Sequence, residues 1–249
     1  MSMIAFYTGA SGMVAFQNAL NVTANNIANV QTPGFKQSRP AFQDLLYSRI
    51  NTNVAGNHLV GHGVKQQYVD LLMGQSGMDQ TNVMLDFAIV GEGFFEVEKD
   101  GQLEYTRNGA FHLSVQDDVA TLVTNDGAFV LDRDGNRINL ERTEDGGYST
   151  DGLADRLGVF TFANPYGLTP SSNSRFLPSA NSGDAVLTIP GNAAAAKPVE
   201  VVQGSLELSG VDLGSQMINI INSQRAFQMN SRVLQTADQL AEEVNNLRR

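Results

Sequence analysis

Two loops in the chain contain residue types that bind calcium or dinucleotides in other proteins, but their spacing departs from what that chemistry needs. Residues 132–136, Asp-Arg-Asp-Gly-Asn, begin like a calcium loop. The sixth position of that loop is Arg137 instead of glycine, and the twelfth is Thr143 instead of the bidentate glutamate. Residues 91–93, Gly-Glu-Gly, follow a strand-like run, yet Glu96 stands where a dinucleotide fingerprint has its third glycine. We therefore interpret both loops as tight turns.

Nucleophiles and metal ligands are equally poorly placed for chemistry. Residues 74–77, Gly-Gln-Ser-Gly, lack the spacing of a nucleophile elbow. His58 and His62 are four residues apart, but the glycines around them disfavour a helix, so we interpret both as solvated loop residues. The chain has no cysteine, and nothing selects one catalytic pair among the many carboxylates between Glu92 and Asp155. The sequence therefore predicts no enzyme, no metal site and no cofactor.

Composition narrows the class of protein further. With 249 residues and 42% hydrophobic residues, the chain can bury a core of one or two domains. A net charge of -10 argues against binding to nucleic acid, which requires clustered basic side chains. The first charged residue is Lys36, so no basic segment of a signal peptide precedes it, and no run reaches the roughly 18 apolar residues of a membrane span. We expect a chain without membrane insertion, either soluble or exported without a cleaved signal.

The elements that open and close the chain are two predicted helices with apolar stripes at heptad-like spacing. The opening stripe consists of Phe6, Met13, Phe16, Leu20, Ile27 and Val30. The closing stripe consists of Leu213, Met217, Ile220, Phe227 and Leu234, and continues in a shifted register with Ala237, Leu240, Val244 and Leu247. Asp212 is the expected N-cap of the closing helix. The spacing predicts a coiled-coil-like unit that is made from both ends of the chain.

The first helix, expected over residues 3–30 and ended by Pro33-Gly34, is intrinsically weak. It contains seven poor helix formers: Gly9, Gly12, Asn18, Asn21, Asn25, Asn26 and Asn29. These residues disfavour the helix by roughly 5 kcal/mol in total, so packing must stabilise it. The asparagines form an uncharged polar face, for which two interpretations stay open. The helix is either buried on both sides in a large core, or it belongs to a polymer in which the amides meet other helices or a channel.

The middle of the chain is predicted to be β-rich. Asp-Gly pairs begin at residues 100, 126, 134, 145 and 151, and an Asn-Gly pair begins at 108; each is a hairpin signal. Residues 36–80 are expected to form a connector, with a short helix around Phe42, Leu45, Leu46 and Ile50. The predicted fold is α+β: a terminal helical domain from residues 1–35 and 208–249, and an antiparallel β-rich outer domain from residues 81–207.

Several segments resemble the bacterial flagellar rod and hook protein family. Residues 24–36, Ala-Asn-Asn-Ile-Ala-Asn-Val-Gln-Thr-Pro-Gly-Phe-Lys, are similar to its N-terminal signature, and residues 86–95, 105–111 and 162–168 to its middle motifs. Residues 204–213 and 224–231 resemble its closing helix. The matching signature positions are Asn25, Asn26, Asn29, Thr32, Gly34, Phe35, Gln224 and Arg225. Length and the Asn-Pro-x-Gly-Leu motif are most like the distal rod members, with proximal rod or hook members second.

Two parts of the chain depart from the family pattern. Ser209-Gly210 replaces the frequent Ser-Asn pair before the closing helix, and residues 176–196 match none of the family motifs. The first difference puts a flexible residue at the head of that helix. Both leave the choice among paralogues open.

The resemblance implies a structural subunit of the flagellar basal-body rod. It implies a helical homopolymer that acts as drive shaft and export channel between motor and hook, with the terminal helices inside and the β domain outside. Phe16, Leu20 and Ile27 would then pack against Ile220 and Phe227 in the assembly seam. The implied partners are other rod and hook subunits, the flagellar export apparatus and a surrounding ring bushing. A rival of a different class is a secreted β-rich binding module with an oligomerising helical stem.

Overall fold

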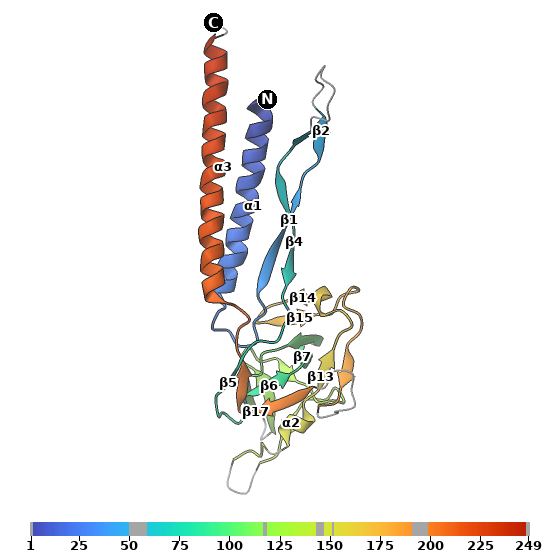
Figure 1. Ribbon diagram of the computed structural model, residues 1–249. Coiled ribbons are helices and arrows are strands. Elements are labelled where there is room, and N and C mark those ends of the chain that lie inside the picture. Colours follow the sequence, from blue (N-terminus) through green and yellow to red (C-terminus); the bar gives the residue numbers. More distant parts are fainter. Residues whose placement is uncertain are drawn as a thin grey trace. The chain divides into compact units, whose positions relative to one another are not determined.

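The computed structural model describes residues 2–49, 59–116, 119–142, 147–150, 152–190 and 199–247. Ile50, His58, Thr143 and the Asp-Gly pair at 145–146 lie outside these ranges. The chain is α+β, with a helix at each end and an antiparallel β-rich middle (Figure 1). It divides into two units. The helical unit consists of Met1–Ala28, Ser38–Leu71 and Asp212–Arg249, and the β-rich unit consists of Asn29–Gln37 and Leu72–Val211.

The helical unit is built on an antiparallel pair of helices, α1 (Ser2–Ala28) and α3 (Leu213–Leu247). Asn26 near the end of α1 bonds to Gln216 near the start of α3, whereas Gly12 lies against Asn230. The buried positions of α1 are mostly small: Gly9, Gly12, Ala15, Ala19, Thr23 and Asn26. Those of α3 are Gln216, Ser223 and Ala237. Small and polar residues therefore line this contact, and the predicted coiled-coil pairing of the large apolar stripes stays a prediction.

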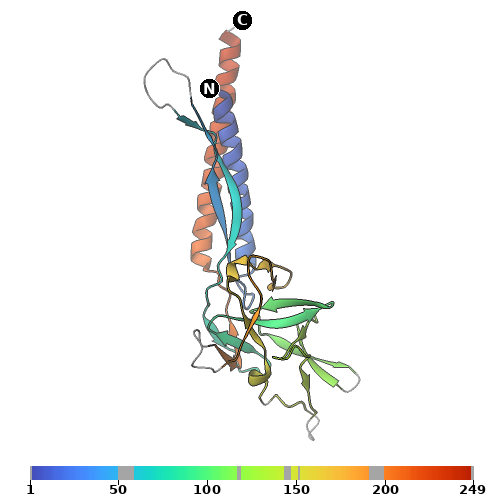
Figure 2. The same cartoon turned by 90° about the vertical axis from the view of Figure 1, so that its right-hand side faces the viewer.

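A two-stranded ribbon lies along α1 in both views (Figures 1 and 2). Strand β1 (Ser38–Asp44) pairs antiparallel with β4 (Val64–Leu71), and β2 (Tyr47–Arg49) pairs with β3 (Leu59–Gly61). The short helix predicted around Phe42 is therefore wrong. Pro40 disfavours a helix here but is tolerated in a ribbon with free edges. The ring of Phe42 packs against Phe16 of α1 at 5.8 Å, so α1 supplies the surface that holds the ribbon.

The β-rich unit contains a ten-stranded sheet and two two-stranded sheets among its described residues, and all their strand pairs are antiparallel. Its strands are β5 (Met78–Gln80), β6 (Phe87–Val90), β7 (Phe94–Lys99), β8 (Gln102–Thr106), β9 (Phe111–Gln116), β10 (Val119–Thr124), β11 (Phe129–Val130), β12 (Asn139–Leu140), β13 (Val159–Thr161), β14 (Thr169–Pro170), β15 (Arg175–Leu177), β16 (Val186–Thr188), β17 (Glu200–Gln203) and β18 (Ser205–Glu207). Two short helices, α2 (Leu153–Arg156) and the 3-10 helix η1 (Pro165–Gly167), complete it. Strand β7 is central, because it pairs with β8, β11 and β13.

Glycine signals in the sequence mark turns at some positions and close packing at others. Asp100 and Gly101, with φ of 51° and 77°, close the β7–β8 hairpin as predicted. At 132–136 the Asp132 carboxylate accepts the backbone N–H of residues 134 and 136, which confirms a turn. The Asn-Gly pair at 108 lies between β8 and β9, but these two strands do not form a hairpin. Strand β8 pairs with β7 and β15, and β9 pairs with β10. Gly109 lies so close to β6 that a Cβ would sit 1.7 Å from the Phe87 carbonyl oxygen.

The core of the β-rich unit is aromatic and aliphatic. The rings of Phe95 and Phe111 meet at 5.3 Å, and those of Phe87 and Phe111 at 6.0 Å. Around them pack fully buried aliphatic side chains that include Ile89, Leu122 and Ile138. Full burial of such side chains stabilises a fold by about 1.5–3 kcal/mol each. The middle of the chain therefore has a core of its own.

Candidate assembly surface and motif junction

The surface of α3 exposes large apolar side chains along its whole length. They are Leu213, Met217, Ile218, Ile221, Met229, Val233, Leu240, Val244 and Leu247. On α1, Phe6, Tyr7 and Val14 are exposed in the same way. Extended apolar surface of this kind marks sites of interaction with other proteins. The helical unit therefore has apolar side chains that its described residues leave exposed.

The residues of the two predicted stripes take different positions in this unit. Phe6, Leu213 and Met217 are exposed, by 43%, 40% and 54%. Seven are partly buried: Met13, Phe16, Leu20 and Ile27 on α1, and Ile220, Phe227 and Leu234 on α3. In the shifted continuation Ala237 is buried, and Leu240, Val244 and Leu247 are exposed. Val30, also partly buried, follows the end of α1. Their role as an assembly seam stays a prediction. The stripe analysis missed Ile218 and Ile221, because it followed heptad spacing rather than the full width of the apolar face.

The asparagines of α1 differ in burial. Asn26 is buried; its amide donates to the Ser38 carbonyl at 2.7 Å and to Gln216 Oε1 at 3.2 Å. Its own oxygen accepts the Ser38 N–H at 2.9 Å. Asn18, Asn21 and Asn25 are exposed on the surface of the unit. Asn26 thus joins α1, α3 and the start of β1, whereas the other three asparagines lie on the exposed surface of α1.

The head of α3 is capped as predicted. The Asp212 carboxylate accepts the backbone N–H of Gly214 at 3.1 Å and the hydroxyl of Ser215. These hydrogen bonds, that of Ser215 first, hold the pKa of Asp212 below its usual value. Further along the helix, the signature residues Gln224 and Arg225 are both exposed. They therefore lie on the outer surface of α3 and outside its buried contact with α1.

Gly9 and Gly12 of α1 provide a matched pair for a test of the close helix contact. A Cβ at Gly9 would meet ordinary van der Waals distances, 3.4 Å or more, so Gly9→Ala is expected to raise the free energy of unfolding by about 1 kcal/mol through helix propensity. A Cβ at Gly12 would lie 2.9 Å from Nδ2 of Asn230, which donates to the Ala226 carbonyl. Loss of that bond, about 1 kcal/mol, cancels the gain in Gly12→Ala. Thermal unfolding followed by circular dichroism distinguishes the two, and equal gains would contradict the contact.

A buried ion-pair junction joins the signature segments within the β-rich unit. Glu207 of β18 accepts Lys36 Nζ at 2.7 Å on one carboxylate oxygen and Arg107 at 3.1 Å on the other. All three side chains are at most 3% exposed. The backbone N–H of Ser76 completes the shell of Glu207 at 2.8 Å. We name Lys36, Arg107 and Glu207 the motif junction.

The two cations of the motif junction are held by carbonyl groups as well as by Glu207. Lys36 donates to the Gly74 carbonyl at 2.8 Å, and Arg107 donates to the carbonyls of Ile89 and Gly91 at 3.1 and 2.5 Å. Burial lowers the pKa of both Lys36 and Arg107, and the charge of Glu207 opposes that effect. The junction is therefore a dense electrostatic network in which one carboxylate serves two buried cations.

The signature glycine fits this junction sterically. Gly34 has φ of 66°, and its N–H donates to the Glu207 carbonyl oxygen at 2.8 Å. A Cβ at this position would lie 2.6 Å from the backbone of Arg107. The next residue, Phe35, accepts the N–H of Gly210 at 2.9 Å. The departure to glycine at 210 also suits tight packing, because a Cβ there would lie 3.2 Å from Ser76 Oγ.

The signature residues Asn29 and Thr32 fold the chain just before the junction. The Thr32 N–H donates to the Asn29 carbonyl at 3.2 Å, and the Ser209 hydroxyl donates to the same carbonyl at 2.9 Å. Sequence reasoning found these segments as motifs but did not pair Lys36 with Arg107 and Glu207. The available signal was that Lys36 and Arg107 are the only charged residues of their matching segments, and that Glu207 offers the opposite charge in a third.

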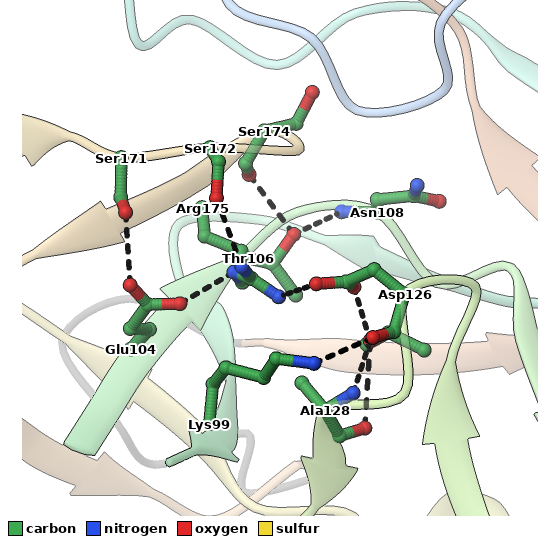
Figure 3. A network of polar contacts seen from close by, with 11 residues as sticks. Lys99, Glu104, Thr106, Asn108, Asp126, Ala128, Ser171, Ser172, Ser174 and Arg175 are labelled. Carbon is green, nitrogen blue, oxygen red and sulfur yellow. Dashed lines mark hydrogen bonds and ion pairs between the residues drawn. The ribbon is translucent and has the colours of Figure 1, made fainter.

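A second polar cluster surrounds Arg175 (Figure 3). Its guanidinium lies between the carboxylates of Glu104 and Asp126 and also donates to Ser172 at 3.0 Å. Lys99 donates to the backbone oxygen of Asp126 at 2.6 Å. The cluster borders a cavity of about 190 Å³. Because Arg175 pairs with both carboxylates and bonds to Ser172 in the turn, we interpret the cluster as a clamp that fixes the β14–β15 turn rather than as a catalytic group.

Acid is expected to weaken this clamp through Asp126. Burial favours a higher pKa for Asp126, but hydrogen bonds from Thr124, Arg175 and Asn173 and the charge of Arg175 outweigh burial and lower it. The stabilisation is thus present above the unfolded pKa, near 3.9, and is lost as pH falls through the lower folded pKa. Asp126→Asn should therefore be less stable than the parent at neutral pH and approach it below about pH 4. Urea unfolding at several pH values tests this, and a pH-independent gap would contradict it.

In the described part of the chain, no group of three or more histidine, aspartate or glutamate side chains is arranged to hold a metal ion. His62 there bonds to the Ser48 hydroxyl at 2.9 Å.

None of the described helices has the length and apolar character needed to cross a bilayer.

Comparison with known proteins matches three parts of this chain to flagellar families. Residues 6–36 match the flagella basal body rod protein family, residues 88–153 the flagellar hook protein FlgE/F/G D1 domain, and residues 202–247 the flagellar basal body rod FlgEFG protein C-terminal family. All three residues of the motif junction lie inside these matches.

Full-length relatives agree with the family matches. The flagellar basal-body rod protein FlgG of Bacillus subtilis is 34% identical over 273 residues, covering 98% of each chain. FlgG of Borreliella burgdorferi is 35% identical with 99% of each chain covered, and FlgG of Agrobacterium fabrum is 35% identical with 96% of this chain and 97% of the relative covered. The chain therefore belongs to the flagellar basal-body rod protein family, resembles its distal rod members, and is a structural subunit of the bacterial flagellar rod.

Proposed function

We propose that this chain polymerises into a helical tube through its helical unit and that the tube acts as drive shaft and export channel between motor and hook. Residues 1–35 and 208–249 are the assembling domain, residues 36–80 the connector, and residues 81–207 the outer domain. The chain has a mechanical role and no catalytic one. Its partners are further copies of itself and other rod and hook subunits. It reaches the rod through the flagellar export apparatus, and a ring bushing surrounds it.

The observation that carries this proposal is the uncovered apolar face of α3. Ile218 and Ile221 are 60% and 48% exposed in the single subunit, and Met229 is 67% exposed. Each such side chain stabilises an assembly by about 1.5–3 kcal/mol when it becomes fully buried. The small-residue contact between α1 and α3 leaves these side chains free for neighbouring subunits. The same proposal includes a coiled-coil-like seam in which stripe residues of one subunit pack against those of another.

The composition of α1 supports assembly in two steps, in which the subunit arrives unfolded and α1 then becomes helical within the polymer. Its glycines and asparagines make it a poor helix by itself, so its order depends on α3, on the ribbon and on neighbouring copies. Gly12 permits the approach of Asn230, and Asn26 bonds across to Gln216. A subunit that emerges unfolded can therefore gain its helical order at the growing end of the polymer, where partner surfaces are present.

The test replaces one exposed apolar residue of α3 and one adjacent exposed polar residue. Ile221→Asp is expected to abolish swimming and rod assembly, because an ionised carboxylate cannot be buried in an apolar contact without a partner. The measurement is swimming in soft agar together with electron microscopy of isolated basal bodies. Circular dichroism of the purified variant should match that of the parent protein, since the side chain is half exposed in the subunit.

Asn222→Asp is the matched control, because it adds the same charge at an exposed neighbouring position without removing an apolar side chain. It is expected to retain most of the swimming. Normal rods and normal swimming in the Ile221→Asp variant would contradict assembly through the apolar face of α3.

A further inference from the structure

An apolar groove opens in the helical unit between the start of α1 and the ribbon. It encloses about 500 Å³ and is lined by Ile4, Tyr7, Ser11, Leu45 and His62. Tyr7 is 64% exposed although it lies beside apolar neighbours. An apolar hollow of this size and lining can receive two or three aliphatic side chains.

The base of the groove is fixed by a close contact between the ribbon and α1. Gly63 has φ of 103°, and a Cβ there would lie 2.1 Å from Ser11 Oγ. The Gly63 carbonyl accepts the Leu45 N–H at 2.9 Å, which holds Leu45 at the ribbon side of the groove. The groove is therefore formed by the fold of the subunit itself and needs no rearrangement to admit a ligand.

The last two turns of α3 carry an apolar rib that matches such a groove. Leu240, Val244 and Leu247 follow one another at steps of four and three residues, so they share one face of the helix. They are 58%, 66% and 87% exposed. No described residue of the subunit covers them to the extent seen for Ala237, which is 7% exposed one turn before the rib.

The rib cannot fill the groove of its own subunit. The contacts of Asn26 with Gln216 and of Gly12 with Asn230 set an antiparallel register that places Ser2 beside residue 240. The rib therefore extends past the start of α1, as Figure 1 shows for the C end of α3. The groove also lies on the ribbon side of α1, whereas α3 packs on another side of that helix. A second copy must supply the occupant.

Charge favours the same pairing. From residue 238 to 247 the charged residues are all acidic, Asp238, Glu242 and Glu243, before the terminal pair of arginines. The ribbon strands next to the groove carry Arg49 and Lys65. Asp44 offsets one of these charges, which leaves the ribbon side positive. At about 100° per residue, Glu243 flanks the rib and meets this opposite charge while the rib enters the groove, whereas Asp238 and Glu242 lie on the far face of the helix.

We propose that the groove of each subunit receives Leu240, Val244 and Leu247 from α3 of a second copy of this chain. The two surfaces lie at different places on the subunit, so the contact is head-to-tail and produces an open-ended assembly instead of a closed dimer. This proposal rests on the proposed polymer and names one specific contact within it. It assigns the last turns of α3 to axial or lateral growth of that polymer.

Cysteine cross-linking in rods tests the contact without background, because the natural chain has no cysteine. Cells expressing the double variant Tyr7→Cys with Val244→Cys are treated with an oxidant, and basal bodies are run on denaturing gels without reductant. We expect a ladder of covalent dimers, trimers and longer chains, since each disulfide joins a groove to the rib of another copy. A second pair, Leu45→Cys with Leu247→Cys, covers the possibility that one position disturbs assembly.

Asn21→Cys with Val244→Cys is the matched control. Asn21 is exposed on α1 about 20 Å along the helix from Tyr7, at about 1.5 Å per residue. This pair should remain monomeric. Rods that form from both groove pairs but give only monomers would overturn the groove contact while leaving the proposed polymer intact. Absence of the unsubstituted chain from basal bodies of the parent cells would instead overturn the proposed function.

Discussion

Replacing Glu207 by glutamine is expected to lower the free energy of unfolding of the β-rich unit by about 3–5 kcal/mol. The substitution keeps the size of the side chain but leaves Lys36 and Arg107 buried without a counter-charge, since both contact its carboxylate at 2.7 and 3.1 Å. Two cations in a site of low polarity then repel each other as well as losing their partner. Urea unfolding of the purified protein, monitored by a probe in the β-rich unit, measures the effect.

Glu98→Gln serves as the control for Glu207→Gln. Glu98 pairs with Arg137 at 3.0 Å, but the pair lies on the surface, where water screens it. Its removal is expected to leave the unfolding midpoint nearly unchanged. A loss for Glu207→Gln as small as that for Glu98→Gln would show that the motif junction contributes little to the stability of the fold.

Gly34→Ala is expected to destabilise the same unit by about 2–5 kcal/mol, for a reason of shape rather than charge. Alanine is disfavoured by about 1–2 kcal/mol at the left-handed φ of 66°. Its methyl group would also lie 2.6 Å from the backbone of Arg107, and backbone cannot rotate away as a side chain can. Because Gly34 donates to the Glu207 carbonyl, displacement of this residue should also disturb the ion pairs.

Gly135→Ala separates the two contributions to the Gly34 effect. Gly135 has φ of 80°, but a Cβ there would meet nothing within 4 Å. Its substitution should therefore lower the free energy of unfolding only by the backbone contribution of about 1–2 kcal/mol. Equal losses in Gly34→Ala and Gly135→Ala would indicate that the contact with Arg107 relaxes at no cost.

The sequence was sufficient for elements whose determinants are local. The terminal helices follow from periodic apolar residues, the N-cap from Asp212, and the β7–β8 hairpin from the Asp-Gly pair at 100. The local pattern near Phe42 wrongly predicts a helix, because the strand there depends on pairing with residues 64–71 and on contact with the ring of Phe16. Neither contact is visible in the local pattern.

The candidate sites also divide into features that the local sequence pattern predicts and features that depend on contacts between distant segments. The stripes identify which ends of the chain form helices with exposed apolar side chains, but the contact between α1 and α3 is made largely by small residues that a search for large apolar side chains passes over. In the same way, Gly109 carries a hairpin signal, yet it serves close packing against Phe87. The spacing of large apolar residues predicts helices and strands. The closest contacts between these elements, however, are made where glycine or another small residue replaces a large side chain.

The motif junction also determines when the β-rich unit can fold as the chain emerges. Glu207 follows Lys36 by 171 residues and Arg107 by 100 residues. A polypeptide that emerges with its N terminus first therefore exposes both cations long before it can offer their counter-charge. Until then, closure of the β-rich unit would bury two unpaired positive charges, which is strongly unfavourable. Completion of this fold is consequently delayed until the last fifth of the chain is free.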